Sequence, residues 1–464
     1  MFTFSGFRDG HSHPLFASRE SSGPHLDAGA TADRIIETLR AYLVEYPQTA
    51  WLDCGSYQSI IESHLDRAVL DRVSDTVPIV VHRVDHHAIC VNSAALETAG
   101  YSDSAPLLSH ASFDLDAEGH PTGIIREWDA MSLIYAHQPP PTLEADLAAL
   151  ERAQQTMLAH GIVAVQDAWI DPGMEVPYLA AAKSGALKLR FNLAPRIDTA
   201  NWQESLRYAK GLRSDVRVTA NALLTVNTVK VFLDGVFGSN TAWVSNDDCI
   251  PAAATGLWVE QDLLRMALAA DSAGFQLHFH CVGDEAFSQA LRVAEHLEMT
   301  NGWVDRRLVI AHADLISAAQ IERAGRLGVI VCAQPSWAGQ ESSFDEAARI
   351  VGSDADRLYP LRSLTEAGVR LSFGSDWPVS APNPIDGILG ATSGHLRQGE
   401  SITVMAALRA YSEGTAHQLA QETLMGDDSV VLSADPLACS PAELAAIRVL
   451  KVTVAGTPVW GADH

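Results

Sequence analysis

Residues 308–333, LVIAHADLISAAQIERAGRLGVIVCA, contain one complete strand and helix followed by the next strand. The apolar run 308–312 predicts a strand. Ser317 and Gln320 form a capping box ahead of apolar residues at helical spacing, and Gly328 predicts the end of that helix. A second apolar run, 329–333, follows at once. The segment therefore predicts a βα unit that leads directly into another strand.

The same layout recurs from about residue 160 onward, and a further strand is predicted near the start of the chain. The eight predicted strands are residues 7–13, 162–166, 187–193, 228–233, 276–280, 308–312, 329–333 and 370–373. Eight successive βα units close most naturally into a barrel. We therefore predict an α/β protein with a (β/α)8 TIM barrel.

Two regions depart from this repeat. Well over a hundred residues separate the first strand from residue 162, whereas a βα loop takes about 2 to 6 residues. An inserted subdomain is therefore expected, with a helix at 31–46 and a strand at 77–82. Near the C-terminus, 429–433 and 449–454 predict a small β appendage. The predicted boundaries are 6–30 and 138–424 for the barrel, 31–137 for an insertion that covers the active site, and 425–464 for the appendage.

Composition excludes several classes of function. The 464 residues are 47% hydrophobic and 19% charged, which is typical of a globular protein with a large core. The formal net charge of −25 would repel nucleic acid and anionic lipid, so neither is expected as a partner. No secretion signal and no run of eighteen apolar residues is present, so we expect a cytoplasmic protein.

The six cysteines are widely spaced and form no CxxC pair, which favours reduced thiols over a zinc knuckle or a disulfide framework. They are Cys54, Cys90, Cys249, Cys281, Cys332 and Cys439.

Candidate metal ligands occur where the predicted strands end, which is where barrel enzymes place their active sites. They are His11, His13, Lys230, His280, His312 and Asp376. Because side chains alternate along a strand, His11 and His13 share one face and can bind one ion. Imidazole with a carboxylate is a ligand set for zinc or another first-row divalent ion. His278 shares a face with His280, and we prefer His280 because it lies nearer the strand end.

Several short motifs, in this order, resemble one known family. They are Asp9-Gly10-His11-Ser12-His13, His82-Arg83-Val84-Asp85-His86-His87, Pro121-Thr122-Gly123-Ile124-Ile125-Arg126-Glu127, Val229-Lys230-Val231-Phe232-Leu233-Asp234-Gly235, His280-Cys281-Val282-Gly283-Asp284, Ala311-His312-Ala313 and Gly374-Ser375-Asp376-Trp377-Pro378. The chain resembles the amidohydrolase superfamily, metal-dependent hydrolases on a distorted (β/α)8 barrel, and within it the third amidohydrolase family, which includes N-substituted formamide deformylase.

The resemblance implies a role for each ligand. His11 and His13 would hold one divalent ion with Asp376, and His280 with His312 would hold a second. Lys230 would be carboxylated and bridge the two ions; the alternative is a neutral or salt-bridged structural lysine. Zinc is the expected metal, with Mn2+ and Fe2+ as alternatives.

The implied activity is hydrolysis of a non-peptide C–N bond in a small molecule, namely an amide, an N-formyl amine or a cyclic amide. A metal-activated water would attack the carbonyl, and Asp376 would carry the proton to the leaving nitrogen. Deaminases of the adenosine deaminase type place Glu three residues after the histidine of strand five, whereas this chain has Gly283. The alternatives are a mononuclear deaminase or lactonase of the same superfamily, or a non-catalytic metal-binding regulatory barrel.

Four residues are predicted to contact substrate: His87, Glu127, Asp234 and Trp377. The alternative for the first two is that polar residues of the insertion only satisfy their own backbone. The chain departs from the family near the C-terminus, where 424–429 replaces the usual Gly-Lys and Ala-Asp pairs. Family members also carry several dozen residues ahead of the first barrel strand, as half of a small β-sandwich. The appendage is therefore expected to be a remnant β-sandwich with an exposed edge, which a homodimer could cover.

Overall fold

The computed structural model describes residues 1–27, 29–245, 255–338, 341–393 and 399–461. Contacts divide the chain into two compact units. The first comprises Met1–Leu15, Leu150–Phe237 and Ala242–His464, and the second comprises Phe16–Ala149 and Gly238–Thr241. Five cysteines are free thiols in the described residues, whereas Cys249 lies outside them.

The first unit is built on two parallel sheets. One has the order β10 (Leu224–Thr225), β9 (Arg190–Pro195), β8 (Ile162–Ile170) and β2 (Phe7–Ser12). The other has the order β11 (Thr228–Phe232), β12 (Gln276–Cys281), β13 (Val309–His312), β14 (Ile330–Ala333) and β15 (Arg370–Phe373). The eight predicted strands are thus confirmed as strands of an α/β fold. Between the described parts of the two sheets no ladder forms; a single parallel bridge pairs Arg196 with Lys230.

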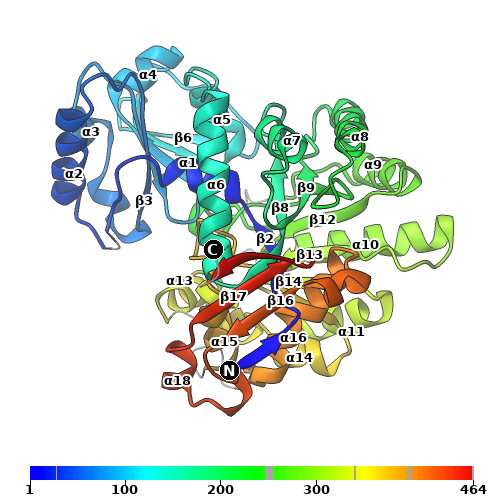
Figure 1. Cartoon of the computed structure of the whole chain (residues 1–464). Helices are drawn as coiled ribbons and strands as arrows, with labels where there is room; N and C mark the ends of the chain where they lie inside the picture. The colour runs from blue at the N-terminus through cyan, green and yellow to red at the C-terminus, as the bar shows by residue number, and fades with distance from the viewer. Residues whose placement is uncertain (28, 246–254, 339–340, 394–398, 462–464) are drawn as a thin grey trace. The chain divides into compact units, whose positions relative to one another are not determined.

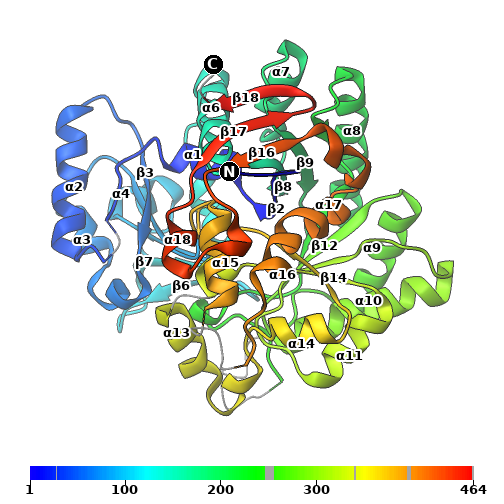
Figure 2. The same ribbon diagram turned by 60° about the horizontal axis from the view of Figure 1, so that its bottom comes forward.

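Helices alternate with these strands, as Figure 2 shows. They are α6 (Leu143–Ala159), α7 (Glu175–Ser184), α8 (Trp202–Thr219), α9 (Glu260–Ser272), α10 (Asp284–Asn301), α11 (Ala318–Leu327), α12 (Pro335–Ala338), α13 (Glu341–Val351), α14 (Leu361–Glu366), α15 (Pro384–Thr392), α16 (Val404–Arg409) and α17 (Thr415–Gln418). Helix α11 begins at the predicted capping box of Ser317 and Gln320, and its C-cap is Gly328 with a left-handed φ of 64°. None of the described helices is both long enough and apolar enough to cross a membrane.

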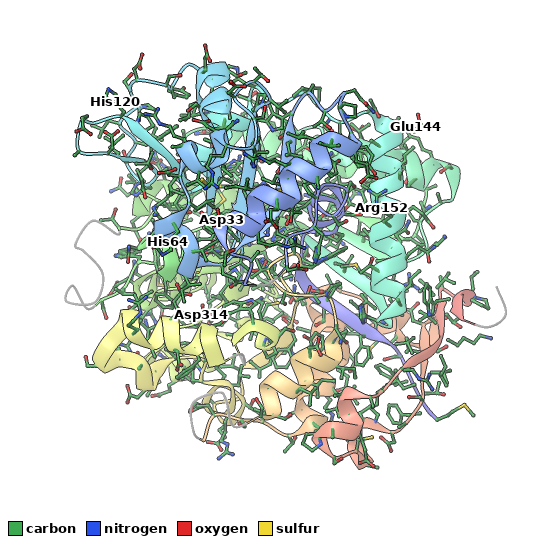
Figure 3. The ribbon with its side chains drawn as sticks, turned by 90° about the vertical axis from the view of Figure 1, so that its left-hand side faces the viewer. Asp33, His64, His120, Glu144, Arg152 and Asp314 are labelled. Atoms are coloured by element: carbon green, nitrogen blue, oxygen red, sulfur yellow. The ribbon has the colours of Figure 1, made fainter. Side chains whose placement is uncertain are left out.

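The second unit contains a five-stranded mixed sheet. Its order is β3 (Leu52–Tyr57), β4 (Ile79–Arg83), β5 (Ala88–Val91), β7 (Pro121–Arg126) and β6 (Ser112–Leu115). The side chains of β4 alternate between two apolar clusters. Ile79 and Val81 pack with residues of α2 (Ala32–Glu45), whereas Val80 packs with residues of α4 (Ser93–Ala99) and α5 (Trp128–Tyr135). The predicted helix and strand of the insertion correspond to α2 and β4; Asp33 in Figure 3 lies in the first turn of α2. The short helix α3 (Arg67–Asp71) and most of α1 (Pro14–Glu20) also belong to this unit.

The C-terminal appendage is an antiparallel sheet that also includes the start of the chain. Its order is β1 (Phe2–Phe4), β16 (Ser429–Leu432), β17 (Val449–Val454) and β18 (Thr457–Gly461), with α18 (Pro441–Ala445) between β16 and β17. Figure 1 shows the blue β1 beside the orange-red β16, and Phe2 is opposite Leu432 in the register. Strand β1 is not among the strands predicted from sequence.

A buried ion-pair network fixes this appendage to the parallel strands. The carboxylate of Asp428 accepts hydrogen bonds from Arg8 (2.9 Å), which lies on β2, and from Arg190 (3.0 Å), which begins β9. Asp428 also accepts the backbone N–H of Ala455 at 2.9 Å. All three charged side chains are almost fully buried, so each charge depends on the others for compensation.

Candidate metal centre

Three predicted ligands that are far apart in the sequence meet in the first unit; 363 positions separate His13 from Asp376. His11 and His13 lie at the end of β2, and Asp376 follows β15. Oδ1 of Asp376 is 3.4 Å from Nε2 of His11 and 3.2 Å from Nε2 of His13. One ligand atom from each residue lies within 4.8 Å of the other two. Two imidazoles and a carboxylate converging in this way fit a first-row divalent ion.

The backbone around these ligands is held by Asp9, which belongs to the first quoted motif but is not among the predicted site residues. Its carboxylate accepts hydrogen bonds from the N–H groups of His11 (3.1 Å) and Ser375 (3.1 Å) and from the hydroxyl of Ser375 (2.6 Å). The N–H of Asp376 donates to the carbonyl of His11 at 2.8 Å. Burial raises the pKa of Asp9 to about 7. The sequence signal for Asp9 is its position two residues before His11, on the same face of the strand.

Lys230 lies on β11, is 1% exposed, and places its Nζ 3.3 Å from Nε2 of His11. Burial lowers the pKa of Lys230 to about 7, because a charged ammonium is costly away from water. Burial therefore favours the neutral form of this amine.

His280 and His312 come from the ends of the next two strands, and their ring centroids are 4.4 Å apart. The ring of His312 also lies 4.9 Å from that of His11. All six residues predicted as ligands thus lie in one cluster, and among the described residues the donor atoms of His11, His13 and Asp376 converge within 4.8 Å. Asp314, labelled in Figure 3, is buried two residues beyond His312, and burial raises the pKa of its carboxyl well above the usual range. No sequence pattern distinguishes Asp314 from an ordinary loop residue.

Asp234, predicted to contact substrate, is 1% exposed and supports the end of β12. Its carboxylate accepts hydrogen bonds from the N–H groups of Val282 (3.0 Å), Gly283 (2.7 Å) and Trp243 (3.1 Å). It also lies 3.3 Å from Nδ1 of His280. This geometry makes Asp234 a support for His280.

Two tryptophan rings lie near the predicted ligands. The ring of Trp169 lies 6.4 Å from that of His13, and its indole N–H donates to Asp171 at 2.9 Å. The ring of Trp337 lies 6.4 Å from that of His312. Trp377 directly follows Asp376, and its carbonyl accepts the N–H of His13 at 2.9 Å.

His87 and Glu127, the other predicted substrate contacts, belong to the second unit and are partners of each other. Nδ1 of His87 is 2.8 Å from Oε2 of Glu127. The hydroxyl of Thr241 donates to the same carboxylate. Glu127 has a left-handed φ of 65°, which is strained for a residue with a side chain.

The sequence matches the model of the amidohydrolase family over residues 1–460. The chain belongs to the amidohydrolase family. It is 28% identical to YtcJ of Bacillus subtilis (strain 168), a protein that is named as an amidohydrolase, and the match covers 98% of this chain and 88% of YtcJ. It is 25% identical to N-substituted formamide deformylase of Arthrobacter pascens, over 97% of this chain and 87% of that enzyme. The resemblance seen in the motifs is thus confirmed.

Two solved structures share the fold. Both are uncharacterized metal-dependent hydrolases, from Pyrococcus horikoshii OT3 and Pyrococcus furiosus. The match to the first has a TM-score of 0.73 at 20% sequence identity, and it covers 95% of this chain and 87% of the P. horikoshii chain. The match to the second has a TM-score of 0.70 at 21% sequence identity, and it covers 94% of this chain and 88% of the P. furiosus chain. Family membership implies a divalent metal, and the donor set of His11, His13 and Asp376 fits one.

Proposed function

We propose that this amidohydrolase hydrolyses a non-peptide C–N bond in a small molecule, such as an amide, an N-formyl amine or a cyclic amide. The observation that carries the proposal is the convergence of Nε2 of His11, Nε2 of His13 and Oδ1 of Asp376 at the strand ends. His11, His13 and Asp376 would hold one divalent ion. His280 and His312 would hold a second, with zinc expected and Mn2+ or Fe2+ as alternatives.

Lys230 would join the two ions as a carbamate. Its neutral amine would attack carbon dioxide, form an N–C bond and release a proton to solvent, which leaves one negative charge on the new carboxylate. The low pKa that burial gives Lys230 supports this step, because the neutral amine is the nucleophile. A carbamate also replaces a buried cation by an anion beside two cations, which is electrostatically favourable.

A bound divalent ion would lower the pKa of water to about 7 and polarise a carbonyl. Asp376 is the residue placed to carry the proton from water to the leaving nitrogen. Burial would raise the pKa of Asp376, but the hydrogen bond from His13 and the nearby His312 and Lys230 hold it well below its usual range. Asp376 is therefore an ionised acceptor at neutral pH.

The two parallel sheets would be the two parts of one distorted (β/α)8 barrel. The bridge between Arg196 and Lys230 supports this arrangement on one side. On the other side, the hydrogen bond from the N–H of Asp376 to the carbonyl of His11 links β15 to β2.

An apolar or aromatic group on the substrate fits the tryptophans near the ligands, Trp169 and Trp337. The name of the formamide deformylase relative supports a substrate with an N-formyl or N-acyl group. Contact of His87, Glu127, Asp234 and Trp377 with substrate stays a prediction, as do a cytoplasmic location and a homodimer.

The deciding experiment measures metal content and turnover on a panel of N-formyl amines, N-acyl amines and cyclic amides, with lactones and amino-heterocycles beside them. We expect bound metal and C–N hydrolysis, reduced at least about 100-fold by Asp376→Asn. His296→Gln, a histidine on α10 outside the site, is the control variant and should retain full activity. Turnover of lactones or amino-heterocycles alone would favour the alternative reactions. Metal-free protein that stays inactive after reconstitution with zinc or manganese and bicarbonate would refute the proposal.

The carbamate is tested separately by reconstituting metal-free protein with zinc in the presence and absence of bicarbonate. Faster recovery of activity with bicarbonate is expected. Equal recovery without it, together with one ion per chain, would favour a mononuclear site with an unmodified Lys230.

A further inference from the structure

Two histidines on β12, His278 and His280, point to the same cluster but have different partners. Nδ1 of His280 faces the carboxylate of Asp234 at 3.3 Å. Nε2 of His278 faces Nδ1 of His11 at 2.9 Å. One histidine is thus supported by a carboxylate, while the other itself contacts a predicted ligand.

The contacts of His11 determine which of its nitrogens is available to a metal. Nε2 of His11 faces Oδ1 of Asp376 at 3.4 Å and Nζ of Lys230 at 3.3 Å, so this nitrogen points into the ligand cluster. A nitrogen that binds metal carries no proton, and therefore Nδ1 must carry it. The hydrogen-bond acceptor for that proton is Nε2 of His278.

This arrangement leaves the other nitrogen of His278 as the N–H. The His278 side chain is fully buried, and its Nδ1 has no hydrogen-bond partner among the residues that the structure describes. A buried N–H without a partner costs free energy, so an apolar side chain would suit the fold better than histidine. Folding alone therefore does not account for a histidine at this position.

We propose that His278 is a positioning residue: it accepts the proton of Nδ1 of His11 and so fixes the tautomer in which Nε2 of His11 binds the metal. This inference rests on the proposed metal centre. His278 is then not a ligand, because its Nε2 lone pair is occupied by His11. His280, held through Nδ1 by Asp234, keeps its Nε2 for the second ion. Hydrogen bonds from the outer nitrogen of a ligating histidine are a general device for tuning metal affinity.

The test compares His278→Leu, which cannot accept a hydrogen bond, with His278→Gln, whose Oε1 can. His296→Gln on α10 is the matched control. Three quantities are measured: zinc affinity by chelator competition, zinc per chain at saturation, and the thermal midpoint of the metal-free protein.

We expect His278→Leu to bind zinc about 10- to 100-fold more weakly than the wild type. Its metal-free midpoint should be unchanged or higher, because the buried N–H is gone. His278→Gln should recover most of the affinity, and the saturated zinc content should be the same in all variants. The two variants thereby separate a positioning role from a structural one, which would lower the metal-free midpoint instead.

Wild-type zinc affinity in His278→Leu would overturn the inference, as would loss of one zinc per chain at saturation in His278→Gln, which would make His278 a ligand. If His278→Leu does not fold, weak binding by a folded His278→Gln would overturn it equally. A wild-type protein that binds no metal would instead refute the proposed function itself, so the two failures are distinguishable.

Discussion

Replacing Asp428 by alanine tests how the appendage is fixed to the parallel strands. Asp428 is the shared partner of Arg8 and Arg190, whose side chains are 0% and 4% exposed. Burial lowers the pKa of Arg8 to about 10, so Arg8 stays charged at neutral pH. Without Asp428 it would therefore remain a buried charge that has lost this partner. Removing one partner of a buried ion pair costs about 3–5 kcal/mol. Because domains are stable by only about 5–15 kcal/mol, Asp428→Ala should lose a large part of the free energy of unfolding.

The assay is urea unfolding at neutral pH, followed by circular dichroism, with Asp427→Ala as the control. Asp427 is the preceding acidic residue and is exposed, so its loss should change the free energy of unfolding by less than about 0.5 kcal/mol. If the free energies of unfolding of Asp428→Ala and Asp427→Ala differ by less than about 1 kcal/mol, the buried network does not stabilise the protein as argued.

Three further substitutions test other parts of the molecule. Gly374→Ala would place Cβ 2.5 Å from the backbone nitrogen of His11, so zinc affinity measured by chelator competition should fall at least about tenfold; wild-type affinity would contradict this. Burial raises the pKa of Glu20 to about 7, so the folded protein keeps a proton that the unfolded chain loses above about pH 4.5. The free energy of unfolding should therefore fall by up to about 3 kcal/mol from pH 4.5 to 7 in urea titrations. If Glu20→Gln shows the same dependence of the free energy of unfolding on pH as the wild type, Glu20 is not the group responsible. Arg83→Lys replaces a buried guanidinium that binds Asp85 through two nitrogens (2.8 and 2.7 Å), so the second unit should be destabilised by about 1–3 kcal/mol, and unchanged hydrogen exchange of β4 would contradict this.

Strands of the parallel sheets were predictable because each is a short apolar run between turn residues. Strand β1 was not, because Phe2–Phe4 has only three residues and is ordered by pairing with Ser429–Leu432. A local pattern carries no information on a partner so far along the chain. The same limit applies to the boundary between the two sheets, where Arg196 and Lys230 form only a bridge.

The ligand positions could be predicted because chemistry-bearing residues recur at strand ends. Their supporting contacts could not. Asp234 follows a strand just as a substrate-contacting residue would, yet its carboxylate meets the backbone of Val282 and Gly283 on the neighbouring strand end. Likewise, sequence could not separate His278 from His280, because the distinction lies in which side chain each one faces.

The pairing of β1 with β16 also has a consequence for the order of events during synthesis. Phe2 and Phe4 leave the ribosome well before Leu432 and Val430, which lie opposite them and follow about 430 residues later in the sequence. At about 5–20 residues per second, this delay is roughly 20 to 85 s. Phe2 and Phe4 have no strand partner during that interval, so the ladder between β1 and β16 cannot form before Ser429–Leu432 has been synthesised. Conditions that slow translation should therefore prolong exposure of this segment to chaperones and proteases more than of any strand in the parallel sheets.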